Sequence, residues 1–214
     1  MCNRKSVLWT ITPHFPPRPI LFCRNCNDKR PFQSSQKFRL NAQGKRLDAW
    51  LIYRCLSCGT RWNRPIIERG FLYKIPGDQL QALQSNDSGL ANSIALDLHG
   101  LKRHTSQIVQ SPEIAVKKDL LSGGPEPWNR LQIHLAVQGP ATIRLDRLLA
   151  TQLSLSRGQI QKWIKTTRLS LAGHGSRPFK RIAQDGSVVQ LELDDSTDSR
   201  NLVRRAIGSV DNQE

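Results

Sequence analysis

Two Cys-x-x-Cys pairs near the N-terminus are the feature that most constrains how this chain can fold. Cys23 and Cys26 form the first pair, and Cys55 and Cys58 form the second. Two thiolates that are two residues apart fit a tight turn whose backbone amides point at the sulfurs. The residue after each pair is Asn or Gly, and both tolerate the left-handed backbone conformation that such a turn needs. The spacing therefore predicts two turns that hold one metal ion between them.

The chemistry of four thiolates favours Zn²⁺, which binds them tetrahedrally at about 2.3 Å per sulfur. Four sulfurs complete the coordination, so we expect a structural zinc cofactor and no metal catalysis. Redox cysteines and an iron–sulfur cluster are alternatives that fit two widely separated pairs less well. Strands are expected over 37–40 and 47–54, joined by a hairpin loop over 41–45. We therefore predict a zinc ribbon, a small antiparallel sheet with a metal at one end, over residues 1–75.

The distribution of charge favours a polyanionic partner. The chain has 214 residues and a net charge of +15. Residues 1–75 contribute +12 and residues 141–181 contribute +8, whereas residues 76–140 are near neutral. Lys and Arg that neutralise phosphates release condensed counterions, which favours binding to nucleic acid. In the ribbon, the candidate nucleic-acid contacts are Lys37, Arg39, Lys45 and Arg46.

The sequence does not suggest a membrane partner. No run reaches the roughly 18 apolar residues of a membrane span, and no lipidation signal is present. We expect a cytoplasmic protein whose cysteines are thiols or metal ligands, with Cys2 as an unpaired thiol.

The middle of the chain is expected to be mainly helical. Helices are predicted over 77–84 and 88–101, within a connector over 76–126, whereas residues 110–121 stay ambiguous. An alternating strand is predicted over 131–137, within a strand and linker over 127–140. The segment has no Gly-rich phosphate loop, nucleophile elbow or paired acid–base motif. We therefore expect neither an enzyme nor a small-molecule substrate.

The C-terminal part is predicted to form two short helices followed by a strand. Four leucines from Leu145 to Leu153 recur at helical spacing. Ser156 starts a second helix, with Gln159 three residues later in a capping-box pattern. Ile160 and Ile164 are expected to face inward, with the cations on the outer face.

A family resemblance rests on these residues. The segments Arg144-Leu145-Asp146, Ser156-Arg157 and Leu169-x-Leu171-Ala172-Gly173, with Leu149 and Ile164, resemble the alpha-L RNA-binding motif of the S-four domain family. Asp185-Gly186 before the apolar strand 187–193 is similar to the family's closing Gly-Asp, in inverted order. Thr167 and Ala172 replace the family's usual Gly and Asn, which puts the turn geometry in question. The predicted domain covers 141–195, followed by an acidic, frayed tail over 196–214.

The resemblance implies binding to structured RNA, such as ribosomal RNA, the ribosome or tRNA. Gln161 is expected to bond a sugar hydroxyl, and the expected phosphate contacts are Arg144, Arg147, Arg157, Lys162, Lys165 and Arg168. A solvated basic face with no ligand is the simpler interpretation of the same helices. Nine Lys and Arg against one acid over 141–181 favour RNA.

The whole chain is similar to a bacterial family of unknown function that combines the ribbon, a helical middle and the RLD and SR motifs. The expected fold class is α+β. The expected function is RNA binding, with DNA as a further candidate partner. The alternatives are a DNA-binding regulator that uses the zinc ribbon and an RNA-modifying enzyme that uses the C-terminal domain for targeting.

Overall fold

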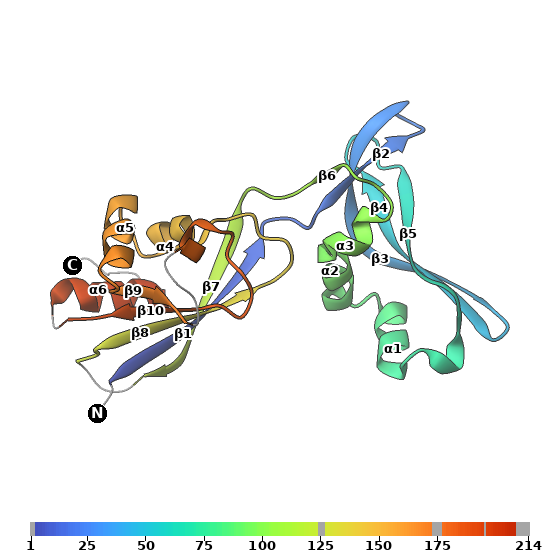
Figure 1. Cartoon of the computed structure of the whole chain (residues 1–214). Helices are drawn as coiled ribbons and strands as arrows, with labels where there is room; N and C mark the ends of the chain where they lie inside the picture. The colour runs from blue at the N-terminus through green and yellow to red at the C-terminus, as the bar shows by residue number, and fades with distance from the viewer. Residues whose placement is uncertain (1–2, 124–126, 173–176, 195, 209–214) are drawn as a thin grey trace, which may run out of the picture. The chain divides into compact units, whose positions relative to one another are not determined.

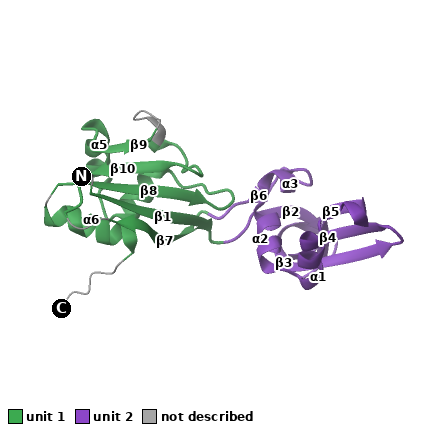
Figure 2. Cartoon of the chain, turned by 90° about the horizontal axis from the view of Figure 1, so that it is seen from below, with its two compact units in different colours: residues 1–14, 112–214 green, residues 15–111 purple. Residues whose placement is uncertain are grey.

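The computed structural model describes residues 3–123, 127–172, 177–194 and 196–208 (Figure 1). The chain forms two compact units (Figure 2). Unit 1 consists of residues 1–14 and 112–214, and unit 2 consists of residues 15–111. Unit 2 is therefore inserted into unit 1 after the first strand. Both units combine a sheet with helices, which confirms the α+β class.

Unit 2 contains a five-stranded antiparallel sheet with the order β5-β4-β3-β2-β6. Its strands are β2 (Arg18–Cys23), β3 (Asp28–Gln43), β4 (Arg46–Cys55), β5 (Arg61–Phe71) and β6 (Ile108–Val109). The predicted hairpin is confirmed, but its strands are longer and its turn is shorter than expected. Gly44 supplies the left-handed conformation of that turn, with φ of +59°.

Three helices cover one face of the unit 2 sheet (Figure 1). They are α1 (Gly77–Ser85), α2 (Ser88–Leu96) and α3 (Leu98–Lys102), after a 3₁₀ turn at Leu72–Lys74. The prediction of a single helix over 88–101 is wrong, because two helices span this segment. The helix is interrupted at Asp97, because the Asp97 carboxylate accepts the Gly100 amide at 2.9 Å and caps the start of a new helix.

The core of unit 2 follows the alternation of β4. Ala49, Leu51 and Tyr53 are fully buried, and the residues between them are only partly buried or exposed. The buried set packs against Leu83 of α1 and Ala91 of α2. This hydrophobic core is larger than the core expected for a small zinc ribbon.

Unit 1 contains a five-stranded sheet with the order β7-β1-β8-β10-β9. Its strands are β1 (Arg4–Pro13), β7 (Ile114–Gly123), β8 (Arg130–Val137), β9 (Leu169–Leu171) and β10 (Val188–Glu192). β1 pairs in parallel with β8 and antiparallel with β7. The N-terminal strand thus belongs to the C-terminal domain, although the sequence analysis placed it with the ribbon. The ambiguous stretch 110–121 forms most of β7.

Three helices complete unit 1: α4 (Leu145–Gln152), α5 (Arg157–Lys165) and α6 (Thr197–Ile207). A further 3₁₀ turn spans Arg177–Lys180. The first two helices and the strands β9 and β10 match the predicted elements. Within the described residues, no helix is long and apolar enough to cross a membrane.

The predicted frayed tail is corrected by α6. Leu202, Val203 and Ala206 are buried, and the buried Trp9 side chain donates Nε1–H to the Ala206 carbonyl at 2.8 Å. Lys118 also donates to the Arg205 carbonyl at 2.8 Å, near the end of the helix. The frayed tail was predicted from the acidic residues of the segment. The segment is ordered because its apolar stripe packs on the sheet. Residues 209–214, Cys2 and Gly173 lie outside the described residues.

Candidate metal centre and nucleic-acid interface

The four cysteines of unit 2 come together as a set that could hold a metal ion. Their sulfurs all lie within 4.8 Å of one another. The Cys23 and Cys58 sulfurs are 3.4 Å apart, and the Cys26 and Cys55 sulfurs are 3.9 Å apart. Sulfurs bound tetrahedrally at about 2.3 Å lie roughly 3.8 Å from one another. The spacing of these sulfurs therefore fits a four-thiolate metal site.

The ends of two strands position the cysteines. Cys23 ends β2 and Cys55 ends β4, and both side chains are buried. The turn after each pair is left-handed as predicted, with φ of +50° at Asn27 and +76° at Gly59. The Gly59 amide donates to the Cys55 carbonyl at 2.9 Å, which closes the second turn. Hydrogen bonds and strand ends thus hold the sulfurs close together.

Electrostatics also favour a cation at this site. The Thr60 hydroxyl, 3.1 Å from the Cys58 sulfur, helps to lower the pKa of Cys58 to about 5. The hydrogen bond with Cys58, followed by burial, raises the pKa of Cys26 to about 12. The pKa of Cys23 is lowered as well, so thiolates are favoured at Cys58 and Cys23, whereas a further negative charge at Cys26 is opposed. A divalent cation removes that opposition by neutralising the thiolates.

In unit 1, two of the arginines predicted to contact RNA form ion pairs with aspartates. Arg144 donates to both carboxylate oxygens of Asp146, at 3.1 and 2.6 Å. Arg168 lies over the Trp163 ring at 4.7 Å and pairs with Asp194 at 3.2 Å. Both guanidinium groups therefore have structural partners, and their expected role as free phosphate contacts is weakened.

The other predicted cations are exposed on the two helices. Arg147 lies on α4, and Arg157, Lys162 and Lys165 lie on α5. In the described parts of the chain, none of these four pairs with an acidic side chain. Gln161 is half-buried between them. The structure thus leaves a smaller set of available cations than the sequence predicted.

The start of α5 is fixed by the predicted cap. The Ser156 hydroxyl accepts the Gln159 amide at 3.1 Å. We expect Ser156→Ala to cost about 1 kcal/mol of stability, because an amide at the helix start loses its partner. Urea unfolding of the full chain with Ser156→Gly as a comparison tests this, since Gly caps nearly as well. An equal loss in both variants would contradict the capping role.

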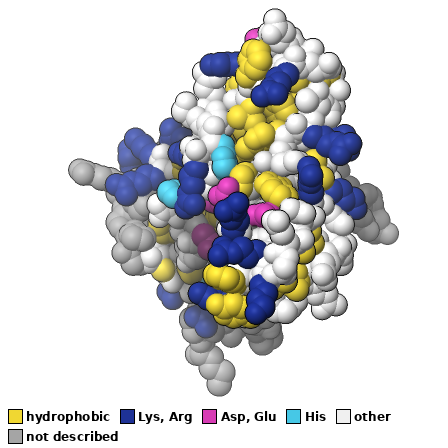
Figure 3. Space-filling view, turned by 90° about the vertical axis from the view of Figure 1, so that its right-hand side faces the viewer, with side chains coloured by type: hydrophobic (Ala, Val, Ile, Leu, Met, Phe, Trp, Pro, Cys, Tyr) yellow, Lys and Arg dark blue, Asp and Glu magenta, His cyan; other side chains and the backbone are white. Residues whose placement is uncertain are grey.

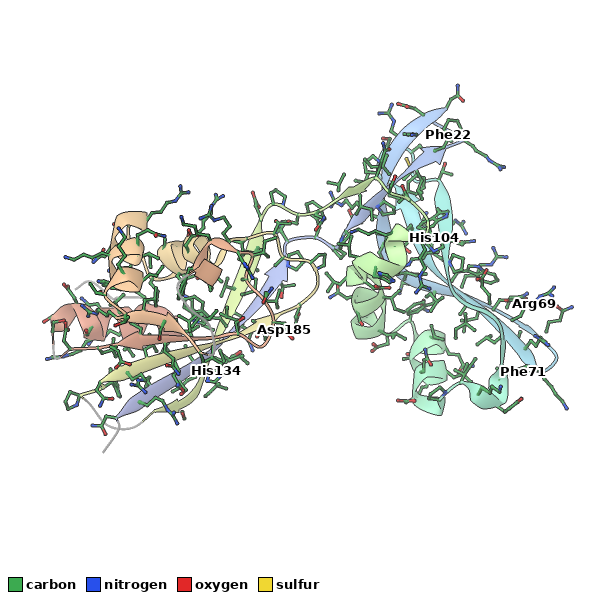
Figure 4. The ribbon with its side chains drawn as sticks, in the orientation of Figure 1. Phe22, Arg69, Phe71, His104, His134 and Asp185 are labelled. Atoms are coloured by element: carbon green, nitrogen blue, oxygen red, sulfur yellow. The ribbon has the colours of Figure 1, made fainter. Side chains whose placement is uncertain are left out.

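Two turns bear on the family resemblance. Thr167 has φ of +56°, which is rare for a β-branched residue. The resemblance places a Gly there, so the backbone keeps a glycine conformation although the residue differs. The Asp185 carboxylate accepts the Val137 amide at 2.8 Å, and Gly186 donates to the Leu135 carbonyl (Figure 4). The Asp-Gly pair thus ties the start of β10 to the end of β8.

The ribbon candidates lie on β3 and on the hairpin that joins it to β4. Lys37, Arg39, Lys45 and Arg46 are all exposed. The Arg39 guanidinium lies 5.6 Å from the Trp50 ring centre. The Arg46 guanidinium lies 4.4 Å from the centre of the Phe71 ring. Sequence reasoning missed Phe71, because only the register of β5 against β4 brings it opposite Arg46.

A buried ion pair joins the helices of unit 2 to its sheet. Arg64 on β5 is only 3% exposed. Its guanidinium donates to the Asp97 carboxylate at 2.9 Å and to the Ile94 carbonyl at 2.7 Å. A Cβ at Gly100 would clash with the Asp97 carboxylate and the Arg64 guanidinium, so a larger residue would disrupt the pair. This pair was not predicted from the sequence, because Arg64 and Asp97 lie 33 positions apart.

Together, the fold and the cysteine site define a two-unit α+β protein with four clustered thiols. Residues 40–174, well over half of the chain, match the model of the family described as "Protein of unknown function (DUF1062)". The chain therefore belongs to this family, as its resemblance to a family of unknown function suggested. No curated protein and no solved structure matches the chain.

Proposed function

We propose that this protein binds structured RNA through the α4–α5 face, with Zn²⁺ as a structural ion at the four cysteines. The observation that carries the proposal is a set of exposed cations on these two helices that have no acidic partner among the described residues: Arg147, Arg157, Lys162 and Lys165. Such cations contact phosphates without reading bases. A folded RNA presents phosphates and 2′-hydroxyls across its shallow groove, which suits recognition by shape.

The order of elements supports the resemblance to the alpha-L motif. Two helices are followed by β9, a turn and β10, and β9 pairs antiparallel with β10. The left-handed backbone at Thr167 agrees with the glycine that the motif usually has there. Arg157 is the first residue of α5, where the free amides of the helix start attract a phosphate. These features favour RNA over a merely solvated basic face.

The paired arginines take a different role in the proposal. Arg144 is oriented by Asp146, and Arg168 is oriented by Trp163 and Asp194. Arg168 also donates to the Glu192 carbonyl at 3.1 Å and so links the start of β9 to the end of β10, whereas the Arg144 pair is local to the start of α4. Gln161 lies between Arg157 and Lys165 on α5, where its amide can reach a sugar hydroxyl.

The cysteine site supports binding and not catalysis. Zn²⁺ at this site would be coordinated by four sulfurs, which leaves no position for water or substrate. The chemistry that zinc supplies there is a crosslink between the end of β2 and the end of β4. We therefore propose that the metal stabilises unit 2.

Charge reversal tests the RNA-binding face. We expect Arg157→Glu/Lys162→Glu to weaken binding of a fluorescent RNA hairpin by roughly ten-fold or more and to lower the salt slope by about two. The comparison variant is Lys117→Glu/Arg204→Glu, which changes the same charge at exposed positions on β7 and α6. Fluorescence anisotropy at several salt concentrations measures both values for the full chain.

Equal losses in the two double variants would contradict the proposed face, because binding would then depend on net charge alone. Competition with duplex DNA of equal charge separates the main alternative. A preference for duplex DNA that depends on residues of unit 2 would favour a zinc-ribbon DNA-binding regulator.

A further inference from the structure

Unit 2 has a second face that its helices do not cover. On β4, the buried residues alternate with Arg46, Asp48, Trp50, Ile52 and Arg54, which point to the opposite side of the sheet. We define the open face as these five residues and their cross-strand partners on β3 and β5. On the side of unit 2 that Figure 3 shows, Lys and Arg lie around and between hydrophobic side chains.

Two aromatic rings on this face lie beside arginines. Trp50 is central on β4 and stands opposite Arg39 in the register of β3. Phe71 stands opposite Arg46 in the register of β5. Trp50 lies four positions after Arg46, which is roughly 13 Å along a strand. That distance leaves room for a nucleotide at each ring and a phosphate between them.

Arg54 and Arg61 give the stronger indication of an anionic ligand. They stand directly opposite each other on β4 and β5, and both are exposed. Neither has an acidic partner in the described part of the chain. Like charges at this position destabilise a sheet, so the pair lowers the stability of the free protein. A phosphate between the two guanidinium groups would relieve the repulsion.

The open face as a whole carries a net positive charge. Arg39, Arg46, Arg54 and Arg61 lie on it, and Asp48 is the acid among the β4 residues. One Asp48 oxygen already accepts the backbone amide of Arg69 at 2.7 Å. Arg69 lies near Phe71 at one end of the sheet (Figure 4). An anion therefore meets mainly arginines and aromatic rings on this surface.

We propose that the open face of unit 2 binds single-stranded nucleic acid, with bases stacked on Trp50 and Phe71 and phosphates held by Arg54 and Arg61. Sheet faces with aromatic side chains bind single strands in this way, because every base has a π-face. An acidic peptide would use the arginines but would gain little from the rings. The proposal rests on unit 2 alone and does not require RNA binding by the α4–α5 face.

The test uses the zinc-loaded full chain and a fluorescent 12-nucleotide oligouridine, which has little secondary structure. We expect Arg54→Gln/Arg61→Gln to weaken binding by roughly ten-fold and to lower the salt slope by about 1.4. Phe71→Leu keeps the apolar contact but removes the ring, and we expect roughly five-fold weaker binding. The matched control is Lys102→Gln/Arg103→Gln, which removes two exposed charges at the end of α3.

Thermal unfolding distinguishes lost contacts from lost structure. Arg54→Gln/Arg61→Gln is expected to keep or raise the melting temperature, because the like-charge pair is gone. A lower melting temperature with reduced zinc content would show that the arginines balance the thiolates, and would overturn the proposal. Losses no larger than in the control, or polyglutamate competing as well as unlabelled oligouridine of equal charge, would overturn it too.

A further comparison separates this site from the α4–α5 face. Arg157→Glu/Lys162→Glu is expected to change the affinity for oligouridine by less than about two-fold. These two residues lie in unit 1, and each phosphate contact contributes separately to the affinity. A failure of hairpin binding alone would contradict only the α4–α5 face. A failure of the Arg54 and Arg61 variant to affect oligouridine would contradict only the open face.

Discussion

Removal of the proposed zinc ion is expected to unfold the cysteine end of the unit 2 sheet, while unit 1 stays folded. Structural zinc contributes about 10–16 kcal/mol to the folding of small zinc-binding peptides, which is comparable to the whole stability of a domain. Cys23, Cys55 and Phe32 belong to the core of unit 2, so losing the crosslink disturbs that core. The core of unit 1 is a separate cluster that includes none of the four cysteines.

Hydrogen exchange with mass spectrometry measures this loss in each unit of the full chain. Incubation with a strong chelator, or Cys55→Ser, is expected to remove protection from β2, β3 and β4. Peptides from β1, β8 and α6 report on unit 1 and should keep their protection. Cys2→Ser is the matched control, because it changes a cysteine that belongs to neither Cys-x-x-Cys pair. Full protection of β4 after zinc is removed would show that the hydrophobic core is sufficient without the metal.

Asp97→Ala is expected to destabilise unit 2 by about 3 kcal/mol, the second-largest effect that the structure predicts. Two losses add together. The α3 start loses its cap, because the Asp97 carboxylate accepts the Gly100 amide. The buried Arg64 guanidinium also loses its carboxylate partner, and a buried unpaired charge is costly.

Two further variants separate these losses. Asp87 caps α2 by accepting the Leu90 amide at 2.7 Å, and it forms no ion pair with any residue that the structure describes. Asp87→Ala is therefore expected to cost only about 1 kcal/mol. Asp97→Asn should keep the cap and lose the charge, so its cost isolates the pairing with Arg64. Hydrogen exchange of α2 and α3 peptides measures all three, and equal costs for both alanine variants would contradict a role for the ion pair.

The same carboxylate gives a pH dependence with a definite sign. Partial burial favours a higher pKa for Asp97, but the Gly100 amide and the Arg64 guanidinium hold the pKa below its usual range. A carboxylate with a lowered pKa in the folded state stabilises the fold above its unfolded pKa of about 4. This stability is lost as the pH falls below that value. Asp97→Asn should show a weaker loss over the same range.

Local patterns in the sequence predicted many elements correctly. The alternation of β4 and β8, the Ser156 cap and the left-handed turns at Asn27 and Gly59 all depend on neighbouring residues, and the structure confirms each. The cysteine set was also predictable, because thiolates at a fixed spacing have few other uses. The helix over 88–101 was less predictable, because an apolar stripe outweighed the capping tendency of Asp97.

The candidate nucleic-acid surfaces were predictable only in part. The sequence showed which segments are basic, but the availability of each cation depends on what lies beside it in the fold. Arg144 has a local acidic partner that could have been noticed, whereas Arg168 meets Asp194 across 26 positions of sequence. The opposition of Arg54 and Arg61 follows from strand register, which composition does not reveal.

By itself, the sequence determined the local structure of this protein: its cysteine-bearing turns, its main strands, its helix caps and the sign of its charge. Tertiary structure alone decided that β1 lies between β7 and β8, that unit 2 is inserted into unit 1, and that α6 packs on Trp9. The physical reason is that caps and alternation depend on adjacent residues. Strand order and the docking of a helix depend on which apolar faces can bury one another across the whole chain.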